Sequence, residues 1–285
     1  MQGTPLACLA SGIWGTVKDV IRIKEDLMSG TAYREPPMKP CSHSPGFDSS
    51  VVDVPQVMEG FSGKPAKNVA EYDLAKRRLI DSELTEKSID FMRRQANGDK
   101  PFFLYVPLTH LHFPTLAHPD FAGKSGVGEF ADSMLEMDFR VGQLIDAVND
   151  LGIRDDTLFI FASDNGPEFR RPWRGTAGPW SGTYHTAMEG GLRVPLIVRW
   201  PGRIEKAVVS DEIIHVTDLF TTLIETAGGV VPVDRPIDGV NQLHWWTGQT
   251  ENSAREGFLF YIKTELRAVK WRHWKLHFVL SLIHI

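Results

Sequence analysis

The sequence has few cysteines, no long apolar run and no excess of positive charge, and each absence excludes a class of protein. Only two of its 285 residues are cysteines, Cys8 and Cys41, which is too few for a disulfide framework. No apolar stretch approaches the roughly 20 residues of a membrane-spanning helix, so we predict no membrane span. The formal net charge is −5, and scattered Lys and Arg give no basic surface for nucleic acid.

The two ends of the chain carry little pattern. The short apolar patch near Met1 has no basic residues before it, so it does not predict a signal peptide and leaves the cellular location undetermined. At the other end, a strand-like pattern stops abruptly, and we interpret residues 280–285 as translated adapter sequence. We therefore expect the chain to be a fragment.

Strands and helices alternate through the middle of the chain, which predicts an α/β fold. Such alternation is typical of a mostly parallel sheet with helices on both faces. Apolar residues recur at three- and four-residue spacings over 132–149, and a second helix of this kind follows Thr217, its predicted N-cap. Three nearly continuous apolar runs predict buried strands, at residues 102–108, 157–162 and 195–200.

Changes in composition divide the chain into three parts. We expect residues 1–68 to be an irregular segment, because 31–68 is rich in Pro, Gly and Ser without a period. Residues 69–229 would form an incomplete α/β core, which begins with two polar helical pieces. Residues 230–285 predict the start of a small antiparallel subdomain, because they contain short strand-like runs.

A polar pair follows the second predicted strand directly. The run 157–162 ends in Ser163-Asp164-Asn165-Gly166-Pro167, where the Gly-Pro pair imposes turn geometry. Asp164 and Asn165 therefore stand at the carboxyl end of a strand, where open α/β sheets place their ligands. Carboxylate and amide oxygens suit hard cations such as Ca²⁺ or Mg²⁺. In isolation such a pair is more often an Asx turn than a metal site.

Two histidines follow the first predicted strand. His110 and His112 are two residues apart on a strand-end loop, so one can enter a site while the other packs or faces solvent. Pro114 favours an extended chain just before it. A histidine beside a bound cation can donate a hydrogen bond to an anionic substrate or act as a general acid. For a single histidine, a structural role in the loop is the commoner interpretation.

A third group of polar residues precedes the strand at 195–200. Tyr184 and His185 are candidates for substrate contact. Paired glycines after Glu189 allow close backbone approach. A turn locked by an ion pair between Glu189 and Arg193 is at least as good an interpretation as a catalytic role for either residue. Trp173 and Trp180, just before this group, could stack on an aryl or sugar ring or simply pack.

The chain contains, in this order, the motifs FFLYVPLTHLHFP, TLFIFASDNGPE, EGGLRVPLIVRWPGRI and HVTDLFTTLIETAG. Together they resemble the sulfatase family, within the alkaline-phosphatase-like superfamily, and the resemblance covers about residues 70–278. The later segments IDGVNQ, REGFLFY and AVKWRHWKLHF resemble arylsulfatases in particular. The resemblance implies calcium-assisted hydrolysis of an aryl or carbohydrate sulfate, with Mg²⁺ as the alternative metal and a sulfated small molecule or glycan as the partner.

The family's residues map onto several of the positions already identified. The resemblance implies that Asp164 and Asn165 ligate the metal and that His112 is catalytic, in contact with the sulfate or the leaving-group oxygen. Many relatives have a sulfate-contacting lysine where this chain has Tyr184. The resemblance therefore implies either that Tyr184 or His185 takes over that contact or that the contact is lost.

Other parts of the family's pattern are absent. Neither Cys8 nor Cys41 fits the Cys-x-Pro/Ala-x-Arg motif from which the family makes its formylglycine nucleophile. No amino-terminal aspartate pair precedes residue 69, and Asp155-Asp156 stands at the wrong end of its strand. We therefore expect the chain to be a truncated enzyme, inactive as written and weak in binding divalent cations. The alternatives are a phosphomonoester or phosphonate hydrolase of the same superfamily and a non-catalytic sulfatase-like protein that binds sulfated glycans.

Overall fold

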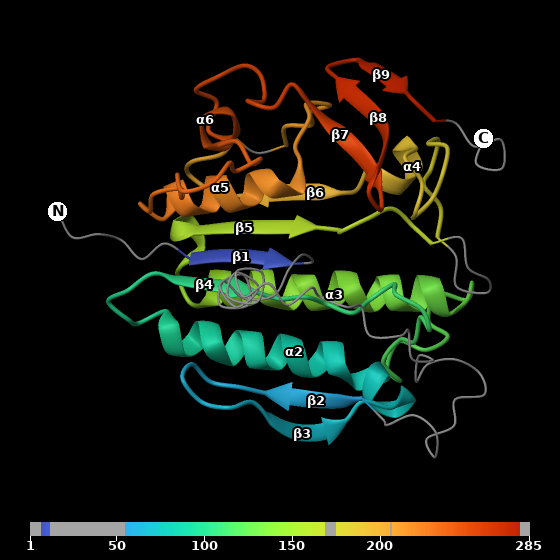
Figure 1. The fold of residues 1–285 in the computed structure, drawn as a ribbon. Helices are drawn as coiled ribbons and strands as arrows, with labels where there is room; N and C mark the ends of the chain where they lie inside the picture. The colour runs from blue at the N-terminus through green and yellow to red at the C-terminus, as the bar shows by residue number, and fades with distance from the viewer. Residues whose placement is uncertain (1–6, 12–54, 169–174, 206, 280–285) are drawn as a thin grey trace.

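The computed structural model describes residues 7–11, 55–168, 175–205 and 207–279, with residues 7–11 described by their backbone alone (Figure 1). The predictions for Cys41, Trp173 and residues 280–285 concern positions outside the described residues. The described elements are β1 (Ala7–Ser11), β2 (Gln56–Glu59), β3 (Lys67–Glu71), α2 (Leu74–Gln95), β4 (Phe102–Tyr105), α3 (Glu129–Asp150), the 3-10 turn η1 (Arg154–Asp156), β5 (Thr157–Ala162), α4 (Glu189–Leu192), β6 (Leu196–Arg199), α5 (Val216–Thr226), α6 (Leu243–Trp246), β7 (Gly257–Ile262), β8 (Glu265–Trp271) and β9 (Trp274–His277).

The central sheet has the strand order β4-β1-β5-β6. Strand β1 pairs in parallel with both β4 and β5, so that Cys8 lies opposite Phe103 on one side and Leu158 on the other. Strand β6 runs antiparallel to β5. Three of the four described strands are thus parallel, which confirms the predicted sheet. The strand β1 falls within the segment predicted to be irregular, because five residues between two partners are held by pairing rather than by a long sequence pattern.

Helices cover both faces of this sheet, as predicted (Figure 1). The side chains of β5 alternate between the faces because successive residues of a strand point in opposite directions. Phe159 packs in one apolar cluster with Met92 of α2 and Val148 of α3. Leu158 and Ile160 pack in a second cluster with residues of α5 and α6. The core therefore consists of two apolar layers, one on each face of the sheet at β5.

The region before β4 differs from the prediction in two ways. Strands β2 and β3 form an antiparallel hairpin where we expected an irregular segment. Residues 74–95 then form the single helix α2 instead of two pieces. The Asp73 side chain caps its first turn by accepting from the Lys76 amide at 2.7 Å, and no Gly or Pro interrupts the residues that follow.

Helices α3 and α5 form where the spacing of apolar residues predicts them, but the start of α5 differs from the prediction. Helix α3 extends the predicted range to Glu129–Asp150. The predicted N-cap of α5, Thr217, is wrong: the cap is His215, whose imidazole accepts from the Thr217 amide while its own amide donates to Asp218. Histidine is not a preferred cap, so the sequence pattern does not point to it.

The carboxyl-terminal strands form a separate antiparallel sheet in the order β7-β8-β9. This confirms the small antiparallel unit predicted after residue 230. Lys270 of β8 and Lys275 of β9 reach Glu189 at the start of α4, so this sheet contacts the loop that leads into β6. Within the described ranges no helix combines the length and apolar character that a membrane crossing requires.

Candidate functional site

The ends of three strands place the predicted polar groups at one edge of the central sheet. Strands β4 and β5 are both parallel to β1, so the residues that follow each of them emerge at the same edge. Strand β6 is antiparallel to β5, so the segment that precedes it begins there too. The loop with His112, the turn with Asp164 and the segment with Tyr184 therefore share one edge, as open α/β sheets arrange their ligand sites.

The turn after β5 is held tightly by its own hydrogen bonds. The exposed Asp164 accepts from the Asn165 amide at 2.9 Å, and the Asn165 side-chain nitrogen donates to the Gly166 carbonyl at 2.9 Å. The Gly166 amide donates to the Gly191 carbonyl of α4 at 2.9 Å. These bonds leave one carboxylate oxygen of Asp164 and the amide oxygen of Asn165 for other partners. The turn is thus held by bonds between adjacent residues and presents two oxygens of the type that hard cations bind.

The two oxygens fit a hard cation in chemistry but not in number. Calcium takes six to eight oxygen ligands, whereas no group of three or more metal-binding side chains occurs among the residues the structure describes. These residues thus do not form a complete calcium site. Burial and, to a smaller extent, the nearby Asp164 carboxylate together raise the pKa of Tyr105 to about 12. A neutral phenol therefore stands close to the Asp164 carboxylate.

The two histidines of the next loop have different surroundings, as predicted. His112 is exposed; its Nδ1 lies 2.6 Å from the Phe113 carbonyl, and its ring stacks on Phe113 at 4.8 Å. A carbonyl only accepts, so Nδ1 carries the proton and Nε2 remains for a substrate. His110 is buried, with Nε2 3.2 Å from a Glu136 oxygen and 3.6 Å from an Asp81 oxygen. His110 is therefore the structural histidine and His112 the one open to a ligand.

Two buried residues of α2 hold the His112 loop, and the sequence reading missed both. Arg77 donates through Nη2 to the carbonyls of Thr109 and His112, at 2.7 and 3.1 Å. Asp81 accepts from the Thr109 amide at 2.6 Å. The signal that the sequence offers is a charged pair at i and i+4, within a segment predicted only to be polar and helical. Their burial instead places them behind the site loop.

A second buried carboxylate, Glu136 of α3, closes the other end of this loop. It accepts from the His118 amide at 2.7 Å and pairs with Arg140. Burial acts to raise the pKa of Glu136, but His110, the His118 amide and Arg140 outweigh it, so the pKa lies below its usual range. The loop between β4 and α3 thus rests on ionised groups at both ends.

Tyr184 and His185 lie on a segment that contacts the end of the Asp164 turn. The Tyr184 amide donates to the Pro167 carbonyl at 3.0 Å, and the two rings lie 3.8 Å apart. His185 adopts a positive φ of 66°, which is uncommon for a residue with a side chain. The Tyr184 bond joins this segment to the turn. Contact of Tyr184 and His185 with a substrate stays a prediction.

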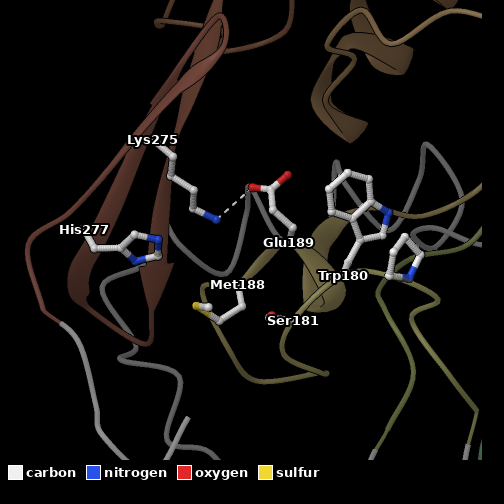
Figure 2. Close-up of a pocket in the computed structure, with 7 residues that line it drawn as sticks. Trp180, Ser181, Met188, Glu189, Lys275 and His277 are labelled. Atoms are coloured by element: carbon white, nitrogen blue, oxygen red, sulfur yellow. Dashed lines mark hydrogen bonds and ion pairs between the residues drawn. The ribbon is translucent and has the colours of Figure 1, made fainter. Parts of the chain in front are cut away.

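The predicted ion pair between Glu189 and Arg193 is present at 3.0 Å. Glu189 also accepts from Lys275 at 3.0 Å and from Lys270 at 3.5 Å. Burial acts to raise the pKa of Glu189, but these cations lower it below its usual range. Glu189 and Lys275 line a cavity of about 250 Å³ between α4 and β9 (Figure 2).

Comparisons with known proteins agree with this geometry. The Sulfatase family model matches residues 30–230, and the model for the carboxyl-terminal part of N-sulphoglucosamine sulphohydrolase matches residues 184–277. Human arylsulfatase D is 32% identical over 215 residues, 71% of this chain and 36% of that protein. Human arylsulfatase A is 38% identical over 195 residues, 66% of this chain and 38% of that protein.

Solved structures give the same result. The PsFucS1 sulfatase of Pseudoalteromonas sp. superimposes with a TM-score of 0.74 at 27% identity, over 78% of this chain and 45% of that structure. This chain spans little more than a third of the length of the curated relatives it matches. With the Sulfatase model covering most of its length and the strand-end motifs in place, the chain belongs to the sulfatase family.

Proposed function

We propose that the chain carries the metal-binding and leaving-group half of the active site of a sulfuric ester hydrolase. One observation carries this proposal: in a chain of the sulfatase family, the Asp164 turn and the His112 loop emerge at the same edge of the central sheet. The first would hold a cation against the sulfate, and the second would face the departing oxygen.

Each residue then has a role that follows from its contacts. Asp164 and Asn165 would supply two of the oxygen ligands of Ca²⁺ or Mg²⁺, and a bound cation stabilises negative charge on sulfate oxygens. His112 holds its Nδ1 proton on the Phe113 carbonyl, so Nε2 faces the substrate. In the imidazolium form Nε2 would donate its proton to the leaving-group oxygen and leave the ring neutral, with the Nδ1 proton still in place. Arg77 positions this loop, while Tyr184 or His185 would contact the sulfate.

The nucleophile is the part of the site that these residues do not supply. The formylglycine motif does not occur among the 285 residues, so we propose that a segment encoded beyond them provides it. The substrate would be an aryl or carbohydrate sulfate, because the relatives include arylsulfatases and an N-acetylgalactosamine-6-sulfatase from dog, 36% identical over 196 residues.

The test is to sequence the transcript on both sides of the coding region and to assay its whole product with 4-nitrophenyl sulfate and 4-nitrophenyl phosphate. We expect an in-frame Cys-x-Pro/Ala-x-Arg motif and preferential hydrolysis of the sulfate. His112→Ala should then reduce kcat by about 10²–10⁴-fold, and Asp164→Asn should reduce it as well. Asp155→Asn, at the opposite edge of the sheet, is the matched control and should leave kcat unchanged. A product without the motif and without hydrolysis would favour the non-catalytic alternative.

A further inference from the structure

A cavity of about 250 Å³ lies between the loop before α4 and strand β9, outside the strand-end groups described above. Figure 2 shows Lys275 and His277 of β9 on one side, Trp180 on the other and Glu189 between them. Drug-sized ligands occupy pockets of about 300–1,000 Å³. This cavity therefore has room for about one substituted ring.

The charges around the cavity leave an excess of positive charge. Three cations, Arg193, Lys270 and Lys275, surround the single carboxylate of Glu189. The cluster therefore carries a net charge of +2. Burial and the neighbouring Lys275 lower the pKa of His277, so its imidazole is neutral at pH 7 and can exchange hydrogen bonds with hydroxyl groups. This surplus favours an anionic ligand that also carries hydroxyls.

The opposite wall offers an aromatic surface. Trp180 is 42% exposed, and the Arg193 guanidinium lies 4.1 Å from its ring centroid. An indole ring held in place by a cation presents a flat apolar surface on which the apolar face of a sugar ring can pack. A wall of this kind beside a cationic wall suits a ring that is apolar on one face and charged at its edge.

The cavity adjoins the proposed sulfate site through the backbone. Ser181 at its rim accepts from the Gly190 amide at 2.8 Å, and the next glycine, Gly191, accepts from Gly166. Gly166 follows Asp164 and Asn165 directly. One short stretch of paired backbone therefore links the cavity to the proposed metal-binding turn.

We propose that this cavity binds an acidic sugar residue of a sulfated glycan, next to the residue whose sulfate ester is cleaved. The proposal rests on the proposed function and narrows its substrate class from aryl or carbohydrate sulfates to glycans that carry a carboxylate or a second sulfate. Lys275 pairs with that anion, Trp180 packs against the ring, and His277 hydrogen-bonds to its hydroxyls.

The test measures binding to the 285-residue chain by calorimetry. The first probe is a chondroitin-derived disaccharide with one uronate and one sulfate ester, and the second is the same disaccharide with its carboxyl group reduced to an alcohol. We expect the intact disaccharide to bind about tenfold more tightly, as one charge-assisted hydrogen bond allows. Lys275→Gln should abolish this preference and Lys275→Arg should keep it. Lys263→Gln, which removes an exposed lysine from the β7–β8 turn, should change nothing.

The aromatic wall has its own variant. Trp180→Ala should weaken the binding of both disaccharides by about three- to tenfold. Trp274→Ala, which removes an exposed tryptophan of β9, should weaken the binding of neither. Equal binding of the two disaccharides, or no binding of either, would overturn the proposal. If Lys275→Gln fails to fold, the comparison of the two disaccharides on the unaltered chain and the Trp180→Ala result still decide.

Asp164→Asn separates this proposal from the function on which it rests. If 4-nitrophenyl sulfate binding in the presence of Ca²⁺ depends on Asp164 while neither disaccharide binds, the glycan proposal fails and the proposed function stands. If the carboxylate preference survives in Asp164→Asn but 4-nitrophenyl sulfate never binds, the acidic-sugar site stands and the sulfatase role loses its support.

Discussion

Replacing Gly166 with alanine should damage both the fold and the proposed metal-binding turn, because that turn touches α4 through its backbone. A Cβ at Gly166 would lie 2.0 Å from the Gly190 carbonyl oxygen and 2.8 Å from the Gly191 Cα, whereas real Cβ contacts essentially never fall below 3.0 Å. The two segments must therefore separate by about 1 Å. Overpacking of this size costs about 1–3 kcal/mol, and neither partner is a flexible side chain that could move aside.

The matched control is Gly142→Ala in α3. No atom lies within 4 Å of a Cβ built at Gly142, so alanine adds helix propensity there without a clash and should stabilise by about 0.5–1 kcal/mol. The free energies of unfolding in urea, measured for both variants and the unaltered chain, should change in opposite directions. If the proposed function holds, a displacement of about 1 Å at Asp164 should lower the turnover of the whole protein by about 10²-fold.

Equal stability of Gly166→Ala and Gly142→Ala would refute this reasoning. It would mean that the contact between the turn and α4 is loose, and that Asp164 is not held in place by the paired glycines. A destabilised Gly166→Ala that keeps full turnover in the whole enzyme would separate the two claims, because the packing argument would stand and the positioning argument would fail.

Three further predictions concern ionisable groups. Asp218→Asn should cost about 3–5 kcal/mol in urea unfolding, because it breaks a buried pair with Arg255. Although burial acts to raise the pKa of Asp218, Arg255 and backbone amides hold it below its usual range. Its contribution is thus complete above the unfolded-state pKa of about 3.9 and is lost as pH falls through the folded-state pKa, so the stability of the unaltered chain should decline more steeply in acid than that of Asp218→Asn. Calcium titration of the chain should show weak binding that Asp164→Asn removes and Asp155→Asn does not; sub-micromolar affinity would contradict the two-ligand count. Asp164→Asn should also lower the pKa of Tyr105 in an alkaline titration followed by NMR, and an unchanged value would place the two groups apart.

The sequence predicted the elements whose signal is local and apolar. Strand β5 was predicted with its exact bounds because six apolar or β-branched residues end at a Gly-Pro turn. Helix α3 followed from apolar residues at helical spacing, and the antiparallel unit at the end of the chain from two strand-like runs. In each case the pattern within one segment determines the structure of that segment.

The elements that the sequence missed depend on partners far along the chain. Strand β1 is held by β4 and β5, which begin about a hundred and a hundred and fifty residues later. Helix α2 buries Arg77, Asp81, Thr85 and Ser88, a polar stripe that single-sequence reasoning assigns to solvent. Arg77 and Asp81 are buried because they supply hydrogen bonds to the backbone of the loop that carries His112. The Thr85 and Ser88 hydroxyls are buried because they donate to carbonyls of their own helix.

The dependence on distant partners also explains why sequence motifs identified the candidate site, whereas arguments from hydrophobic patterns and spacing identified only part of it. Arg77 holds the His112 loop, the Gly191 carbonyl holds the Asp164 turn, and Lys275 ties the carboxyl-terminal sheet to Glu189. All three attachments are polar, and none belongs to either apolar cluster of the core. Hydrophobic periodicity therefore locates the sheet but not the groups that fix its functional edge. Those groups are charged residues and glycines whose contacts form only when segments that are distant in the sequence come together. High salt should weaken the Lys275 attachment, which is partly exposed, more than the buried Arg77 attachment. The cavity proposed to bind an acidic sugar should therefore lose its geometry before the His112 loop does.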